Sequence, residues 1–215
     1  MDMRWESLFD DLESQLEHEL GAEEAQLAAE EERLRLGRLS LRARLSALAA
    51  GPEGAPGFGS GDSAGVLRIE LRSGALVSVR ALTFGKDWFA GELVAAGVRR
   101  PQCVIPFAAI SGVLLDRGGV ERSLREQPGA SARLAERIGL AFVLRDLCRR
   151  RAAVELDCGG NLSGAARVLH GTIDRVGRDH CDLAMHDVGV PRRSALVTGY
   201  RIVPFDQLMM LRLTV

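Results

Sequence analysis

The chain has 215 residues and an apolar content of 47%, which is enough for two small domains and an extension. Its 28 basic and 29 acidic residues exclude the strongly basic composition of a dedicated nucleic-acid-binding protein. No apolar stretch approaches the ~18 residues of a membrane span, and no basic start leads into an apolar run, so we expect a cytoplasmic protein without membrane contact.

The charges are distributed unevenly along the chain. Residues 1–49 hold twelve acids and six arginines, which leaves 22 basic and 17 acidic residues for 50–215. The net charge is therefore −6 for the first segment and +5 for the second. An acidic arm on a mildly basic body predicts contact with another copy of the chain or with a basic partner.

Residues 1–49 form the first predicted element, a long acidic amphipathic helix that is helical from residue 4 and could be hinged. Apolar residues recur at three and four positions, thin out between 21 and 32, and then resume. These residues are Trp5, Leu8, Leu12, Leu16, Leu20, Leu34, Leu41, Leu45 and Leu48. Such a helix would be ~70 Å long, more than one small domain can cover. We expect it to pair with another copy or another protein; the alternative is that it folds back on its own body.

Residues 50–65 are rich in glycine, proline and serine and form a predicted linker. The first predicted β-barrel follows at 66–120. Strict alternation at 67–72 indicates a half-buried antiparallel strand, and four more short strands follow near 77–84, 89, 103–105 and 110–115. Five short strands without a crossover helix are typical of a small barrel.

The second predicted barrel, with a helix before it, occupies 131–215. Residues 131–151 have apolar side chains on more than one face, which predicts a connecting helix packed between the two barrels, and 116–130 read as polar turns. Strands are expected near 154–158, 169–173, 181–185, 196–203 and 208–213.

The two barrel segments match each other in sequence. Residues 79–95 align with 171–187, so that Gly85-Lys86-Asp87-Trp88 falls on Gly177-Arg178-Asp179-His180. Further on, Val104-Ile105-Pro106-Phe107 falls on Ile202-Val203-Pro204-Phe205. The sequence therefore predicts an α+β protein in which a five-stranded unit has been duplicated in tandem.

The matching hairpins are candidate interaction sites, because each carries a cation and a flat ring. Lys86 and Trp88 in the first, and Arg178 and His180 in the second, could stack on a base and meet a phosphate. They could equally form a protein-contact patch, or the ring could simply cover the mouth of the barrel.

The sequence does not predict a metal or catalytic site. His170, His180 and His186 cluster with Cys158 and Cys181, but strand alternation directs histidine and cysteine to opposite faces. The four cysteines form no C-x-x-C pair and suit small apolar residues in a reducing compartment. Asp87 and Asp179 lie in turns, where an aspartate commonly binds its own backbone. We expect no cofactor and no small-molecule substrate.

The segments 171–185 and Ile202-Val-Pro-Phe-Asp-Gln-Leu208 resemble the Sm-like (Hfq-like) and SH3-like small barrels, most clearly over 140–215 and more faintly over 66–115. The Sm-like resemblance implies an RNA-base pocket, in which Asp182 stands nearest the position that is asparagine in that family. The chain also resembles an actinobacterial family that opens with Arg-Trp-Glu-Ser-Leu-Phe-Asp-Asp-Leu-Glu, here residues 4–13, and to which no function is attached. We expect a non-enzymatic interaction or adaptor protein; the alternative is an RNA-binding regulator that uses the four hairpin residues.

Overall fold

The computed structural model describes residues 3–51, 65–94, 100–125, 134–159 and 167–214; near the N-terminus, side chains are described at Phe9 and from residue 12 onward. The chain divides into two compact units, Met1–Ser40 and Leu41–Val215. The second unit includes both predicted barrels. The predicted linker lies mostly outside the described residues.

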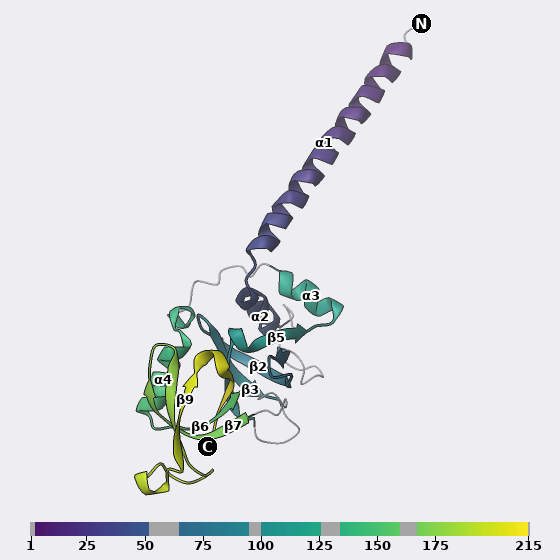
Figure 1. Cartoon of the computed structure of the whole chain (residues 1–215). Coiled ribbons are helices and arrows are strands. Elements are labelled where there is room, and N and C mark those ends of the chain that lie inside the picture. Colours follow the sequence, from purple (N-terminus) through teal and green to yellow (C-terminus); the bar gives the residue numbers. More distant parts are fainter. Residues whose placement is uncertain (1–2, 52–64, 95–99, 126–133, 160–166, 215) are drawn as a thin grey trace. The chain divides into compact units, whose positions relative to one another are not determined.

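The first unit is helix α1 (Met3–Arg38), and a second helix, α2 (Leu41–Ala49), follows it (Figure 1). The prediction of one helix from 4 to 49 is therefore wrong at Leu39 and Ser40, which are not helical. Gly37 disfavours helix, and Ser40 is a residue type that favours a helix start, so the sequence carries a local reason for the break. Leu45 and Leu48 are buried, and α2 packs on the strands that follow it.

The first five strands run as a meander that returns to its start. They are β1 (Val66–Leu71), β2 (Leu76–Phe84), β3 (Trp88–Leu93), β4 (Gln102–Pro106) and, after the 3₁₀ turn η1 (Phe107–Ala109), β5 (Ile110–Leu114). Each strand is antiparallel to its neighbours, and β5 pairs with β1. We call these strands the first half-sheet.

The second half-sheet has the same strand order. It consists of β6 (Ala153–Cys158), β7 (Arg167–Val176), β8 (His180–Met185), β9 (Gly199–Pro204) and β10 (Leu208–Leu213). The 3₁₀ turn η3 (Ser194–Leu196) precedes β9, and η4 (Phe205–Gln207) precedes β10. β10 pairs with β6 just as β5 pairs with β1.

The two half-sheets join into one antiparallel sheet of ten strands, in the order β5-β1-β2-β3-β4-β10-β6-β7-β8-β9. The junction is the pairing of β4 with β10, where Val104 lies opposite Leu211 and Cys103 opposite Arg212. Among the described strands, β5 pairs only with β1 and β9 only with β8, so the sheet is not closed and has two free edges.

Two apolar cores cross this junction. Trp88 and Val104 of the first half-sheet pack in the core of the second, while Met209 and Met210 of β10 pack in the core of the first. The shared cores explain why Leu41–Val215 forms a single compact unit.

The helices between the half-sheets differ from the predicted ones. The polar segment after β5 forms α3 (Arg117–Leu124), because Asp116 Oδ1 accepts a hydrogen bond from Gly119 N at 2.6 Å and caps the helix. The predicted helix 131–151 is instead η2 (Leu134–Arg137) followed by α4 (Leu140–Arg149), with its first three residues outside the described ones. α4 packs mainly on β7 and exposes Phe142, while Leu140 at its start lies in one core with Trp88 of the first half-sheet.

Within the described part of the chain, no helix combines the length and the apolar character needed to cross a lipid bilayer.

Candidate interaction site

The hairpin Gly85–Trp88 joins β2 to β3 and is closed by a hydrogen bond from Gly85 N to Trp88 O at 2.8 Å. The indole ring folds back over Gly85, where an added Cβ would lie 2.3 Å from the ring. A glycine is therefore required at position 85 for the ring to take this place. The prediction that Gly-Lys-Asp makes the turn is confirmed.

The first hairpin holds the start of α4. Lys86 N and Trp88 Nε1 both donate to the carbonyl oxygen of Ile138, each at 2.9 Å. In return, Leu140 N donates to Asp87 Oδ1 at 2.8 Å, so the carboxylate lies at the N-terminal end of the helix, where it is favoured. Three hydrogen bonds thus fix the segment 138–140 on the hairpin.

Trp88 is only 6% exposed as a consequence. The sequence left open whether the Trp88 ring forms a contact surface or covers the barrel. The structure places the ring in the core, with its N–H bonded inside the molecule. Lys86 remains exposed beside it. The cation and ring of this hairpin therefore do not form a surface on which a base could stack.

The second hairpin, Gly177–His180, has the same backbone. Gly177 N donates to His180 O at 2.9 Å, and an added Cβ at Gly177 would lie 2.5 Å from the imidazole ring. Phe205 N donates to Asp179 O at 2.8 Å, just as Phe107 N donates to Asp87 O at 2.9 Å. The two hairpins are thus anchored to their half-sheets by corresponding hydrogen bonds.

The side chains of the second hairpin face solvent. Arg178 and Asp179 are exposed, and the side chain of His180 is 44% exposed. His180 Nδ1 donates to Asp179 Oδ1 at 2.8 Å, and this hydrogen bond holds the pKa of the Asp179 carboxyl below its usual value. Among the described residues, no helix start docks on this hairpin.

The candidate residues on α1 are placed only in part. Leu12 and Leu16 are 51% and 57% exposed. Trp5 and Leu8 lie on the described helix, but their side chains are outside the described ones. These residues share one helix, which belongs to a different compact unit from the two hairpins.

The second half-sheet also contains a buried polar pair, His186 and Thr172, whose hydrogen bond the sequence did not predict. His186 is 4% exposed, with Nε2 2.9 Å from Thr172 Oγ1 and Nδ1 donating to Asp187 O at 3.1 Å. Because that carbonyl can only accept, Nε2 of a neutral His186 accepts from the threonine hydroxyl. His170 lies edge-on to this ring and bonds the His186 carbonyl oxygen through Nδ1 at 3.0 Å. These histidine nitrogens are engaged inside the fold.

The described residues contain no group of three or more His, Cys, Asp or Glu side chains that could hold a metal ion. Two of the thiols are also poor nucleophiles. Burial raises the pKa of Cys103 to about 11 and that of Cys181 to about 12, whereas a reactive cysteine needs a lowered pKa.

Asp157 is a buried acid that sequence reasoning missed. It is 5% exposed, its Oδ1 has no hydrogen-bond partner among the described residues, and burial raises its pKa. A raised pKa is typical of catalytic acids. However, Asp157 belongs neither to the hairpins nor to the hollow lined by α2, α3, β1 and β5, so it does not form a site with them. The alternation of β6 gave no signal, because it predicts Asp157 on the outward face.

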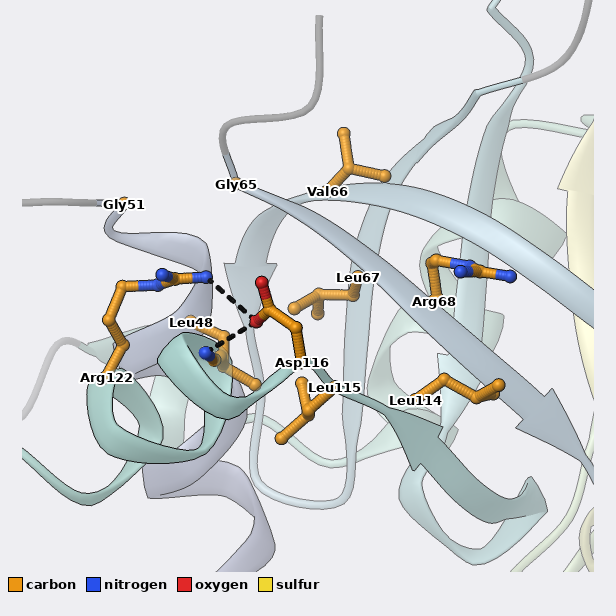
Figure 2. A pocket seen from close by; sticks show the side chains of 11 residues that line it. Leu48, Gly51, Gly65, Val66, Leu67, Arg68, Leu114, Leu115, Asp116 and Arg122 are labelled. Atoms are coloured by element: carbon orange, nitrogen blue, oxygen red, sulfur yellow. Dashed lines mark hydrogen bonds and ion pairs between the residues drawn. The ribbon is translucent and has the colours of Figure 1, made fainter. Parts of the chain in front are cut away.

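A hollow of about 460 Å³ lies between α2, α3, β1 and β5 (Figure 2). Its polar side chains are Arg68, Asp116 and Arg122. Asp116 Oδ1 already binds Gly119 N and lies 3.8 Å from Arg122 Nη2, and its side chain is 80% exposed. The hollow therefore lacks the enclosed, convergent polar groups of a catalytic pocket.

No protein-family model, no curated protein and no solved structure matches this chain.

Proposed function

We propose that this chain is a non-enzymatic adaptor that binds a basic amphipathic helix of another protein along α1. The observation that carries the proposal is the exposed apolar side chains on an acidic helix. We also propose that the chain acts in the cytoplasm and needs no cofactor or small-molecule substrate.

Six large apolar side chains described on α1 are more than half exposed. Their exposed fractions range from 51% to 66% for Phe9, Leu12, Leu16, Leu20, Leu27 and Leu34. Leu20, Leu27 and Leu34 follow one another at intervals of seven residues, which places them on one side of the helix. Fully burying a leucine side chain contributes about 1.5–3 kcal/mol, so a partner helix along this side would gain several such terms.

The charge of α1 favours a basic partner over a second copy. Residues 5–32 contain eleven acids and no lysine or arginine. Two such helices side by side would place like charges along both flanks of the apolar side, which is unfavourable. A partner helix with lysine or arginine on its flanks would instead be complementary, and its binding would weaken as salt rises.

A binding experiment with synthetic helices tests the proposal. Two labelled peptides share one leucine pattern, with lysine and arginine flanks in one and glutamate flanks in the other. We expect the full chain to bind the basic peptide in fluorescence anisotropy, more weakly at high salt, and the acidic peptide not at all. The substitution Leu20→Glu should weaken binding about tenfold or more, because it removes at least one buried leucine from the contact.

Ala22→Glu is the matched control. It adds the same charge but lies on the side of α1 opposite Leu20 and Leu27, so affinity for the basic peptide should barely change. Equal binding of both peptides, or equal effects of the two substitutions, would contradict the proposal. So would an α1-dependent dimer in light scattering that Leu20→Glu dissolves, because the partner would then be a second copy.

RNA binding through the two hairpins is not favoured by a specific observation. The Trp88 ring is buried, so the first hairpin has no free ring for stacking. Arg178 is exposed and the side chain of His180 is 44% exposed, but they supply one cation and one ring, not a duplicated pair of stacking surfaces.

We also infer that the two half-sheets descend from one Sm-like or SH3-like five-stranded unit, copied in tandem. Their strand orders correspond, and so do their irregularities: the β2–β3 register shifts between Ala81 and Thr83, and the β7–β8 register between Ile173 and Arg175, the matching positions. The 3₁₀ turns before β5 and β10 also begin at matching residues, Phe107 and Phe205. Unrelated sheets would not be expected to share their bulges.

A further inference from the structure

The segment that docks on the first hairpin has a counterpart elsewhere in the chain. Arg137-Ile138-Gly139-Leu140 leads into α4, and Arg38-Leu39-Ser40-Leu41 leads into α2. The local geometry also corresponds, because Leu39 N donates to Leu36 O at 3.2 Å and Ile138 N donates to Ala135 O at 3.0 Å. One turn into each helix, Leu45 and Leu144 are both fully buried under their own half-sheets.

The two segments differ in the surroundings of their last leucine. Leu140 is 4% exposed, because it lies against the first hairpin and in the second core. Leu41 is 43% exposed. The chain therefore contains two similar helix starts, and in only one of them does this leucine lie in a core.

The second hairpin offers the groups that the first hairpin uses. Asp179 corresponds to Asp87, whose carboxylate accepts a hydrogen bond from Leu140 N at the start of α4. Arg178 corresponds to Lys86, whose backbone N–H donates to the carbonyl oxygen of Ile138. Among the described residues, Arg178 N has no hydrogen-bond acceptor, and the Asp179 side chain bonds only His180. The hairpin is preformed, since its backbone closure and its anchoring bond to Phe205 N are both in place.

The two edge strands of the sheet also correspond to two strands that pair with each other inside the chain. β9 corresponds to β4 and β5 corresponds to β10, and β4 pairs with β10 inside the chain. Ile202 on β9 is 67% exposed, whereas the matching Val104 is 7% exposed under its partner strand. Leu114 on β5, which matches Arg212, is 43% exposed. Exposed apolar residues on unpaired edge strands favour strand addition.

We propose that copies of this chain associate head to tail, β9 of one copy pairing with β5 of the next. In the same contact, the segment Arg38–Leu41 of the next copy docks on the Gly177–His180 hairpin, as 137–140 docks on Gly85–Trp88. The internal junction sets the register, so Arg201 lies opposite Leu114 of the next copy, as Cys103 lies opposite Arg212. Such a heterologous contact continues into a ring or a filament, in contrast to a two-fold dimer. The inference rests on the proposed duplication and not on the partner of α1.

Disulfide trapping between two full-length variants tests the register directly. Leu114→Cys and Arg201→Cys are prepared separately, mixed and mildly oxidised. Directly opposite residues on antiparallel strands have Cα atoms ~4.5–5.5 Å apart, which a disulfide can span. We expect the mixed disulfide in the mixture to exceed any dimer of either variant alone by about tenfold, because pairing raises the effective thiol concentration.

Tyr200→Cys is the matched control. Tyr200 is an exposed neighbour on the same strand whose side chain points to the other face, so its mixture with Leu114→Cys should give only background cross-linking. Adding Leu41→Ala to the Leu114→Cys chain should lower the yield, because it removes the docking leucine. Equal yields for Arg201→Cys and Tyr200→Cys, or a dominant Arg201→Cys homodimer, would overturn the proposal. Association through α1 alone would raise the cross-linking yields of Arg201→Cys and Tyr200→Cys equally, so it would not produce the expected excess for Arg201→Cys.

Discussion

Trp88→Ala should lower the free energy of unfolding of the Leu41–Val215 unit by about 3–5 kcal/mol, the usual cost of truncating a buried tryptophan. Trp88 is 6% exposed and packs in the core that joins the half-sheets. The substitution also removes the indole hydrogen bond to Ile138 O, which helps hold the start of α4. Loss of this side chain should therefore loosen both the junction and α4.

The measurement is urea denaturation followed by pulse proteolysis, which reports the folded fraction of the compact unit independently of α1. His180→Ala is the matched control, since it truncates the ring at the corresponding hairpin. His180 is 44% exposed on its side chain, so we expect a change within about 0.5 kcal/mol. Equal losses of unfolding free energy for the two variants would contradict the burial of one hairpin ring and the exposure of the other.

Gly171→Ala should destabilise the second half-sheet by at least about 1–3 kcal/mol, the range for overpacking a rigid interior. A Cβ at this position would lie 2.3 Å from the carbonyl oxygen of Ala184, on the paired strand β8. The oxygen belongs to the backbone, so no side-chain rotation can relieve the contact, and the strands must separate. Gly91→Ala should behave alike in the first half-sheet, because its Cβ would lie 2.3 Å from Arg80 O.

Gly112→Ala on β5 is the control for the glycine substitutions. Its Cβ would lie 3.5 Å from Glu70 Oε2, an ordinary contact with a flexible side chain. Alanine is favoured over glycine within a strand by about 0.5–1 kcal/mol, so this variant should be neutral or slightly more stable. Thermal melts of the three variants, followed by near-ultraviolet circular dichroism, would show the order. A melting temperature for Gly171→Ala equal to that of the unchanged chain would contradict the predicted strand contact.

The strands were predictable because alternation is a strong local signal. Leu67, Ile69 and Leu71 are all buried on β1, as their period of two predicts. The turn before the last strand of each half-sheet was predictable from Pro106-Phe107 and Pro204-Phe205. These features depend on residues that are close together in the sequence.

The junction was not predictable, because it depends on contacts between distant residues. Nothing near Val104 indicates that Leu211 lies opposite it, so two separate barrels were predicted in place of one sheet. The sequence could not decide between an exposed and a covered Trp88 ring for the same reason, since its partner Ile138 is 50 residues away. At Leu39 and Ser40 the signal was local but was missed. The helical spacing of the apolar residues predicted a helix through these two positions, which are not helical.

Amide hydrogen exchange by NMR tests the central claim, that the two hairpins are equivalent docking sites of which one is filled by the chain itself. In dilute protein, the Lys86 amide should exchange slowly because it is bonded to Ile138 O, and the Arg178 amide should exchange fast. At higher protein concentration, Arg178 should slow while Lys86 stays unchanged. An Arg178 amide that is as protected as Lys86 in dilute protein, or one that exchanges equally fast at every concentration, would contradict the account.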